Sequence, residues 1–181
     1  MKTKRIFIAI NLPNKIKDEL SRFQDALNEL PVKWIKKDNL HITLSFIGKI
    51  DDNQILEVGE IVKNIVADYN KFFVNLIEID YGPKNIFPPR MIWATIGDNS
   101  ALREINKNLE KSLKLKNDNF FPHITLGRIN QWQYKKIEPE ERQEIKQDID
   151  LNFKVKSIDI MESKLSPRQA KYNILRALEL K

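Results

Sequence analysis

The only two histidines of the chain open the same four-letter segment. His41 begins "HITL" at residues 41–44, and His123 begins a second "HITL" at residues 123–126. An unperturbed imidazole titrates near pH ~6.5, so one histidine can accept a proton while another donates one. Two facing imidazoles therefore suit general acid–base catalysis, in which each proton transfer typically contributes about 10²–10⁴-fold in rate.

The third letter of each segment is a threonine, Thr43 in the first copy and Thr125 in the second. Alternate side chains of a strand point to the same face, so each histidine shares a face with its threonine while the isoleucine and leucine face the core. A threonine hydroxyl can donate to a phosphate oxygen and stabilise the charge of phosphoryl transfer. We therefore predict that His41, Thr43, His123 and Thr125 are catalytic. Duplication alone would preserve the four letters, but it would not explain why histidine occurs nowhere else.

Several other chemistries find no support in the composition. The chain has no cysteine, which excludes disulfides and thiolate ligands, and two histidines are too few for a zinc site. The five glycines stand far apart, so neither a P-loop nor a dinucleotide-binding fingerprint is present. We expect no metal and no cofactor. The lack of cysteine also fits a reducing compartment, and we expect a cytoplasmic protein without a membrane segment.

The chain is basic, with a formal net charge of +6. Such a surface attracts polyanions, and nucleic acid is the first of these to consider. Lys33, Lys36 and Lys37 could follow an RNA backbone, although solvated surface charge is the simpler explanation. Charge by itself therefore indicates a class of partner and identifies no site.

The hydrophobic pattern predicts the elements that must position the two histidines. Strands are expected at 5–10, 32–35, 39–48, 72–79, 90–97, 120–129, 152–163 and 171–180. Helices are expected at 16–30, from Asp51 with Gln54 as its capping-box partner, from Asn99 or Ser100 to 113, and, as a short one, at 140–147. Loops are expected at 81–90 and 130–138, with a turn at Pro167.

The order of strand, helix and HITL strand occurs twice. Ala9 precedes His41 by 32 residues (41 − 9), and Ala94 precedes His123 by 29 (123 − 94). We infer a diverged internal duplication, which predicts one domain over residues 1–181 with two similar lobes. The mixed element order, with hairpin-like strand pairs and no sustained βαβ series, favours an α+β fold.

The paired segments, 82 residues apart (123 − 41), resemble those of the two-histidine phosphoesterases. The closest branch is the LigT-like RNA 2′,3′-cyclic phosphodiesterases, historically named 2′-5′ RNA ligases. The resemblance covers nearly the whole chain and includes "RIFIAINLP", "PPRMIW" and "ESKLSPRQAKYNIL". One departure is Gln169, where the resemblance leads us to expect glycine.

This resemblance implies two pseudo-symmetric lobes, each an antiparallel sheet with helices packed outside, around a central groove without metal. It implies hydrolysis of a terminal 2′,3′-cyclic phosphate of RNA to a 2′-phosphate. By motif position, His123 accepts a proton from water, His41 protonates the leaving 3′ oxygen, and Thr43 and Thr125 hold the phosphate. Nothing in the sequence breaks the symmetry of the two histidines, so their roles could be exchanged.

Two further residues are candidates for binding the substrate. Arg128 follows the second motif as in the family, and its guanidinium suits phosphate. Strict alternation from His123 would put Arg128 on the opposite face, so it needs a bulge or a strand end, which Gly127 could permit. Phe7 resembles a family aromatic that lines the groove and could stack a base, although it could equally be a core residue.

Two other classes of function remain open at this stage. The protein could be an esterase or ligase that acts on 2′-5′ linkages or on small cyclic nucleotides. It could also be a non-catalytic RNA-binding module whose histidines only grip phosphate. For the phosphodiesterase that the resemblance implies, the expected partner is an RNA or oligonucleotide end that bears a cyclic phosphate, bound by a monomer and without a membrane.

Overall fold

The computed structural model describes residues 3–27, 29–115, 120–164 and 170–181. Within these ranges nine strands form one connected sheet. The strands are β1 (Lys4–Asn11), β2 (Val32–Trp34), β3 (His41–Ile50), β4 (Phe72–Gly82), β5 (Met91–Ile96), β6 (His123–Ile129), β7 (Gln147–Val155), β8 (Ser157–Lys164) and β9 (Lys171–Glu179). The helices are α1 (Asn14–Ala26), α2 (Asp52–Val66), α3 (Ser100–Leu113) and α4 (Gln131–Lys135), with 3₁₀ turns η1 (Lys37–Asn39) and η2 (Pro139–Glu141).

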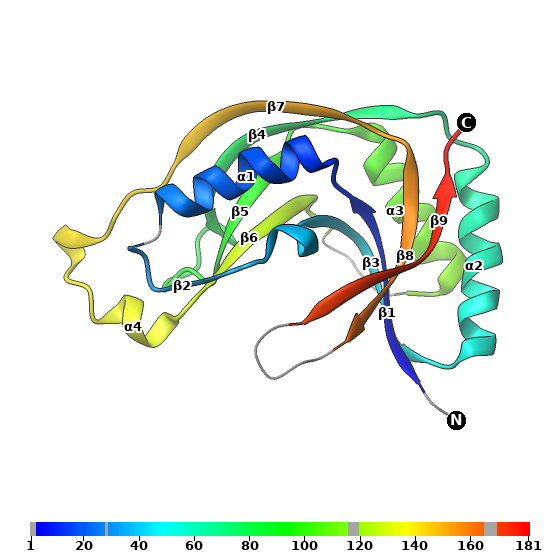
Figure 1. Ribbon diagram of the computed structural model, residues 1–181, viewed down its shortest axis with the longest axis horizontal. Coiled ribbons are helices and arrows are strands. Elements are labelled where there is room, and N and C mark those ends of the chain that lie inside the picture. Colours follow the sequence, from blue (N-terminus) through cyan, green and yellow to red (C-terminus); the bar gives the residue numbers. More distant parts are fainter. Residues whose placement is uncertain (1–2, 28, 116–119, 165–169) are drawn as a thin grey trace.

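The sheet consists of two halves that meet at the HITL strands (Figure 1). Its order is β7-β4-β5-β6-β3-β1-β8-β9, with β2 added beside β6. Neighbouring strands are antiparallel, and the halves join where Ile42 of β3 faces Ile124 of β6. The expected α+β fold with antiparallel lobes is therefore confirmed.

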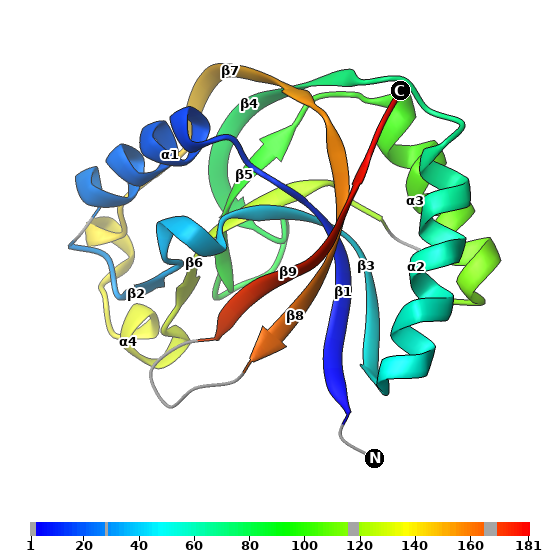
Figure 2. The same cartoon turned by 45° about the vertical axis from the view of Figure 1, so that its right-hand side comes forward.

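The longer helices lie at the outside of the sheet. In Figure 2, α1 lies on one side and α2 with α3 on the other, with the strands between them. Their apolar stripes join a core that includes Leu20, Val62 and Leu102 of the helices and Ile8 and Ile42 of the strands. Burial of such side chains removes apolar surface from water and holds both HITL strands in place.

The opposite face of β1 carries a separate small cluster. Phe7 and Ala9 pack there with Met161 of β8, and Tyr172 of β9 covers them. Because strand side chains alternate, this cluster points away from the main core and toward the polar letters of HITL. The face of β1 that carries this cluster is therefore the face on which the histidines lie.

The two HITL segments pair with their neighbouring strands in equivalent registers. Ala9 faces Thr43, and Trp93 faces Thr125 in the same way. In both pairs the register shifts directly after the threonine, at Leu44 and Leu126. Trp93, and not Ala94, is thus the residue that corresponds to Ala9.

Four local predictions were wrong. Residues 130–138 are not all loop, because Asn130 accepts a hydrogen bond from the backbone N–H of Gln133 and begins α4. The helix expected at 140–147 is only the short turn η2, and β7 starts at Gln147. Gly48 does not end its strand, because β3 accommodates it with φ of 96° and continues to Ile50.

The fourth error concerns residues 152–163, which form parts of two strands. The buried positions change phase between Val155 and Ile158. β7 ends at Val155 and β8 begins at Ser157, with one residue between them. β7 pairs with β4, whereas β8 pairs with β1 and β9, so this segment crosses from one half of the sheet to the other. The turn expected at Pro167, and Gln169, lie outside the described residues. No helix in the described ranges is long and apolar enough to span a membrane.

Candidate active site

Both HITL segments line one groove between the halves of the sheet. This central groove has a volume of about 510 Å³, and its walls include His41 and Thr43 from β3 and His123 and Thr125 from β6. The volume lies within the range of about 300–1,000 Å³ that is typical of small-ligand sites. The structure therefore brings together the four residues that the sequence singles out, and it places Phe7 and Arg128 in the same walls.

Both histidines are oriented by the same local device. Nδ1 of His41 lies 2.6 Å from the carbonyl oxygen of Asn39, and Nδ1 of His123 lies 2.8 Å from that of Phe121. A carbonyl oxygen only accepts hydrogen bonds, so Nδ1 carries the proton in each neutral ring. Nε2 is then the nitrogen available for proton transfer. In His41 it lies 2.9 Å from the hydroxyl oxygen of Thr43.

Burial lowers the pKa of both histidines. For His41 the pKa falls to about 4, because loss of hydration and the nearby charges of His123 and Lys17 outweigh the bond to the Asn39 carbonyl. For His123, burial lowers the pKa against the opposing effect of the Phe121 carbonyl. Both rings are therefore neutral near pH 7 in the free protein. An anionic ligand in the groove would raise both pKa values, because an opposite charge favours the protonated form.

The aromatic surroundings of the two histidines differ. His123 stacks on Trp93, with ring centroids 3.9 Å apart and planes inclined by 23°. His41 instead meets the edge of Tyr172, at 5.2 Å and 89°, and the tilted ring of Phe7 at 5.1 Å. Reasoning from the sequence missed Trp93 and Tyr172, since their positions depend on pairing between strands that are distant along the chain.

A bulge places Arg128 in the groove. The β5–β6 register shifts between Gly127 and Thr125, which reverses the alternation and turns Arg128 onto the face of the histidines. Of the two arrangements that the sequence left open for Arg128, a bulge or a strand end, the structure shows a bulge, at Leu126. Gly127 is also required by packing, because a Cβ there would lie 2.3 Å from Cγ1 of Val32.

Phe7 lies in the wall of the groove, but its ring is almost fully covered. Its exposed fraction is 3%, and the rings of His41, Tyr172 and Phe46 surround it. The aromatic side chain that the groove does expose is Phe46, at 74%. Phe46 stands five residues after His41, as Arg128 stands five after His123, and this equal offset is the signal that could have found it.

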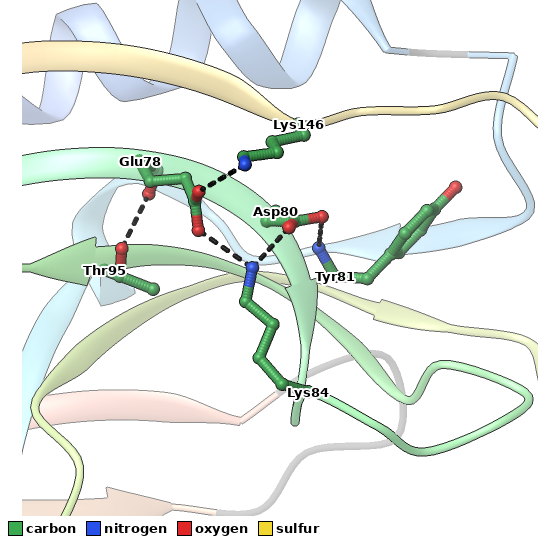
Figure 3. Close-up of polar contacts among 6 residues, drawn as sticks. All are labelled: Glu78, Asp80, Tyr81, Lys84, Thr95 and Lys146. Atoms are coloured by element: carbon green, nitrogen blue, oxygen red, sulfur yellow. Dashed lines mark hydrogen bonds and ion pairs between the residues drawn. The ribbon is translucent and has the colours of Figure 1, made fainter.

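The carboxylates of β4, the strand next to β5, are neutralised by lysines (Figure 3). Nζ of Lys84 lies 2.8 Å from Glu78 and also contacts Asp80, and Lys146 lies 3.7 Å from Glu78. Thr95, which faces His123 across the β5–β6 pair, donates to the backbone carbonyl of Glu78. The negative charges of Glu78 and Asp80 are thus compensated by the two lysines.

The potential ligands in the centre of the groove are two imidazoles and two hydroxyl groups. Within the described ranges, no three His, Cys, Asp or Glu side chains converge in a group that could hold a metal ion.

Comparison with known proteins agrees with this arrangement. The family model "LigT like Phosphoesterase" matches residues 10–93. An RNA 2′,3′-cyclic phosphodiesterase of Methanocaldococcus jannaschii is 30% identical over 95% of this chain and 98% of its own. One from Thermotoga maritima is 26% identical over 94% of this chain and 92% of its own. A crystal structure of E. coli LigT complexed with NADP⁺ superposes with a TM-score of 0.80, at 21% identity over 99% of both chains. The chain thus belongs to the family of LigT-like phosphoesterases.

Proposed function

We propose that the protein hydrolyses the terminal 2′,3′-cyclic phosphate of RNA to a 2′-phosphomonoester without a metal ion. The observation that carries this proposal is the pair of histidines in one groove, each with Nδ1 held by a carbonyl two residues earlier. The names of the relatives from M. jannaschii and T. maritima support the choice of substrate.

The proposed reaction uses one histidine as a base and the other as an acid. Nε2 of His123 takes a proton from water as the water oxygen forms a bond to phosphorus. The bond from phosphorus to the 3′ oxygen breaks, and Nε2 of His41 gives that oxygen its proton. The product carries the phosphate on the 2′ oxygen, and each histidine has exchanged its protonation state.

The surroundings of the two histidines support this assignment. The face of an indole attracts a cation, so Trp93 would stabilise the imidazolium that forms on His123. His41 must bind its proton together with the substrate, because its pKa in the free protein is about 4. The anionic phosphate supplies the charge that makes this protonation favourable.

The remaining polar groups of the groove would hold the phosphate. Thr43 and Thr125 would donate hydrogen bonds to its non-bridging oxygens, and the guanidinium of Arg128 would offset the charge that develops on them. Phe46 offers an exposed ring on which a base could stack, whereas the covered ring of Phe7 would serve as the floor beneath His41.

The test compares the wild type with His41→Ala and His123→Ala on an oligoribonucleotide that ends in a 2′,3′-cyclic phosphate. Loss of either proton transfer should lower kcat by about 10²-fold or more. The wild type should keep its activity in the presence of a chelator and give a bell-shaped pH profile. Full activity in either variant would contradict the acid–base pair, and loss of wild-type activity with chelator would contradict metal independence.

A second candidate is an esterase for small cyclic nucleotides, because the volume of the groove suits a ligand of that size. Turnover of a cyclic mononucleotide in preference to the oligoribonucleotide would favour it. A 2′-5′ ligase would instead join two oligonucleotides, and a binding module would hold the substrate without turnover.

We also propose that residues 1–181 form one bilobal domain that arose by internal duplication. The common register around Thr43 and Thr125, with its bulge at the same position, supports this origin. The protein would act as a cytoplasmic monomer, because the groove is completed by a single chain. Light scattering at working concentrations would test the monomer.

A further inference from the structure

We propose that the central groove continues into a second anion-binding subsite, formed by Arg5 and Lys33 with Arg128 at its border. Its ligand would be the internucleotide phosphate next to the cyclic end of an RNA strand. This inference rests on the proposed function for the terminal phosphate and adds a requirement for a chain of at least two nucleotides.

The subsite is a hollow beside the groove. It has a volume of about 250 Å³. Arg5, Ile35, Arg128 and Tyr172 line both the hollow and the groove, so the two are continuous. Lys33 lines the hollow but not the groove. A ligand bound to the histidines could therefore extend into the hollow without crossing a wall.

The hollow lies beside the reacting phosphate and not on it. Thr125 lines the groove but not the hollow, Lys33 lines the hollow but not the groove, and Arg128 stands at the border between them. Lys33 lies across from Arg128 on β2, which pairs with the end of β6 away from His123. The catalytic phosphate and the ligand of the hollow would thus be separate groups of one molecule.

Two strand registers set like charges directly opposite each other, and three of the four side chains line this hollow. Lys33 faces Arg128 in the β2–β6 register, and Arg5 faces Lys49 in the β1–β3 register. Directly opposed like charges destabilise an antiparallel pair. The pair of Lys33 and Arg128 lies wholly at the hollow, whereas Lys49, the partner of Arg5, lines neither the hollow nor the groove. An anion bound in the hollow would relieve the repulsion between Lys33 and Arg128.

The ion pairs of the described residues do not include these cations. In the part of the chain that the structure describes, none of Arg5, Lys33, Lys49 and Arg128 forms an ion pair. On β4 the opposite holds, because Glu78 and Asp80 are both paired with Lys84 (Figure 3). The cations of the hollow are therefore without an ion-pair partner among the described residues, whereas Glu78 and Asp80 on β4 are paired.

The backbone under these cations is held firmly. A Cβ at Gly127 would lie 2.8 Å from the ring of Trp34 and 2.3 Å from Val32, so β2 packs against β6 more closely than any other residue would allow. Lys33 lies between these two contact residues on β2. Its position beside Arg128 is thus set by strand pairing, which reduces the cost of ordering it around a ligand.

The experiment compares three substrates. The first is a trinucleotide that ends in a 2′,3′-cyclic phosphate, and the second is the same trinucleotide with a neutral methylphosphonate at its last internucleotide linkage. The third is the 2′,3′-cyclic mononucleotide. The wild type should prefer the first over the second by about fivefold in kcat/KM, as expected for one exposed charge contact of about 1 kcal/mol. The methylphosphonate retains the bases, so it separates the phosphate contact from stacking.

The variants Lys33→Gln and Arg5→Gln should reduce this preference toward one. Each should also lower the slope of log affinity against log salt for the trinucleotide by about 0.7, as expected when a protein neutralises one phosphate fewer on a single strand. Lys107→Gln, on the exposed side of α3, removes the same charge away from the groove and should leave both values unchanged.

Equal kcat/KM for the charged and neutral linkages, or an unchanged salt slope in Lys33→Gln, would overturn the subsite. If the mononucleotide is hydrolysed as well as the trinucleotide, the subsite is wrong while the proposed function stands. If no substrate is turned over, the proposed function fails, and a measurement of binding affinity then tests the subsite by itself. A trinucleotide with a terminal 2′-phosphate should then bind the wild type more tightly than Lys33→Gln, and equal affinity would overturn it.

Discussion

Trp93 lies almost flat against His123, with ring centroids 3.9 Å apart, whereas the corresponding position in the other half of the sheet is Ala9. Trp93 faces Thr125 just as Ala9 faces Thr43. The space beside His41 is filled instead by the edge of Tyr172. Two identical four-letter segments are thereby given unlike surroundings, as the proposed roles of acid and base require.

Replacement of Trp93 by leucine should lower the pKa of His123. The face of an indole stabilises an imidazolium by about 0.5–2 kcal/mol, which corresponds to roughly half a pKa unit to one and a half. Because the chain has only two histidines, NMR titration of their ring protons reports both values in one experiment. Trp93→Phe keeps an aromatic face and should retain most of the effect. An unchanged pKa of His123 in Trp93→Leu would show that the stacking is only packing.

Gly82→Ala should disturb the same contact from behind. A Cβ at this position would lie 2.2 Å from Cδ2 of Trp93, so the indole must move. We expect a tenfold or larger loss of kcat/KM. Misplacing a reacting group by ~1 Å can lower the rate by a factor of about 10². Gly97→Ala is the matched control, because its nearest neighbour is the Cγ2 methyl of Ile77 at 3.2 Å. Equal kinetics in the two variants would contradict this role of Gly82.

Asn39→Ala should reduce both stability and activity. The backbone carbonyl of Asn39 accepts from Nδ1 of His41. The buried side-chain amide of Asn39 donates to the carbonyl of Ala170 at 2.7 Å and accepts from the backbone N–H of Tyr172. Loss of these bonds should lower the free energy of unfolding by about 1–3 kcal/mol and let the ring of His41 turn. Urea unfolding and kcat/KM measure the two effects.

Asn99→Ala provides the control for that experiment. Asn99 also makes two side-chain hydrogen bonds, to the carbonyl of Phe73 and from the N–H of Leu102, but it caps α3 away from the groove. It should lose a comparable amount of stability and keep its kcat/KM. If Asn39→Ala behaves in the same way, the carbonyl of residue 39 does not depend on its side chain for its position.

The stability of the fold should decrease as the pH falls from 7.5 to 5. His41 has a pKa of about 4 in the folded protein and near ~6.5 in the unfolded chain, so the unfolded chain takes up the proton first. Stability is unaffected by this group above pH ~6.5, and the loss grows as the pH falls toward ~4, reaching about 2 kcal/mol at pH 5. His123 acts in the same direction, because its pKa is also lowered.

Urea unfolding at several pH values measures this effect as the difference between the wild type and His41→Asn. The subtraction removes the carboxylates that titrate in the same range, because they are common to both proteins. The wild type should lose more stability than the variant on acidification. Parallel curves for the two proteins would mean that His41 titrates normally in the fold.

The sequence by itself determined the four residues at the centre of the groove. A strand repeats every two residues, so His41 with Thr43 and His123 with Thr125 must share faces, and the isoleucines and leucines between them anchor the strands. The same local rules determined the capped start of α2, where Asp51 and Gln54 bond reciprocally. These features depend on neighbours only a few residues apart, and such patterns are legible in a single chain.

The tertiary structure decided the features that arise from contacts between distant segments. The bulges at Leu44 and Leu126 turn Phe46 and Arg128 toward the groove, and both depend on the register with a partner strand. The stacking of Trp93 on His123 depends on the strand pairing that sets the two rings beside each other. So does the opposition of Lys33 and Arg128, residues separated by 95 positions (128 − 33) along the chain. The register that brings such residues together depends on the burial pattern of both paired strands at once, and it cannot be read from either strand alone.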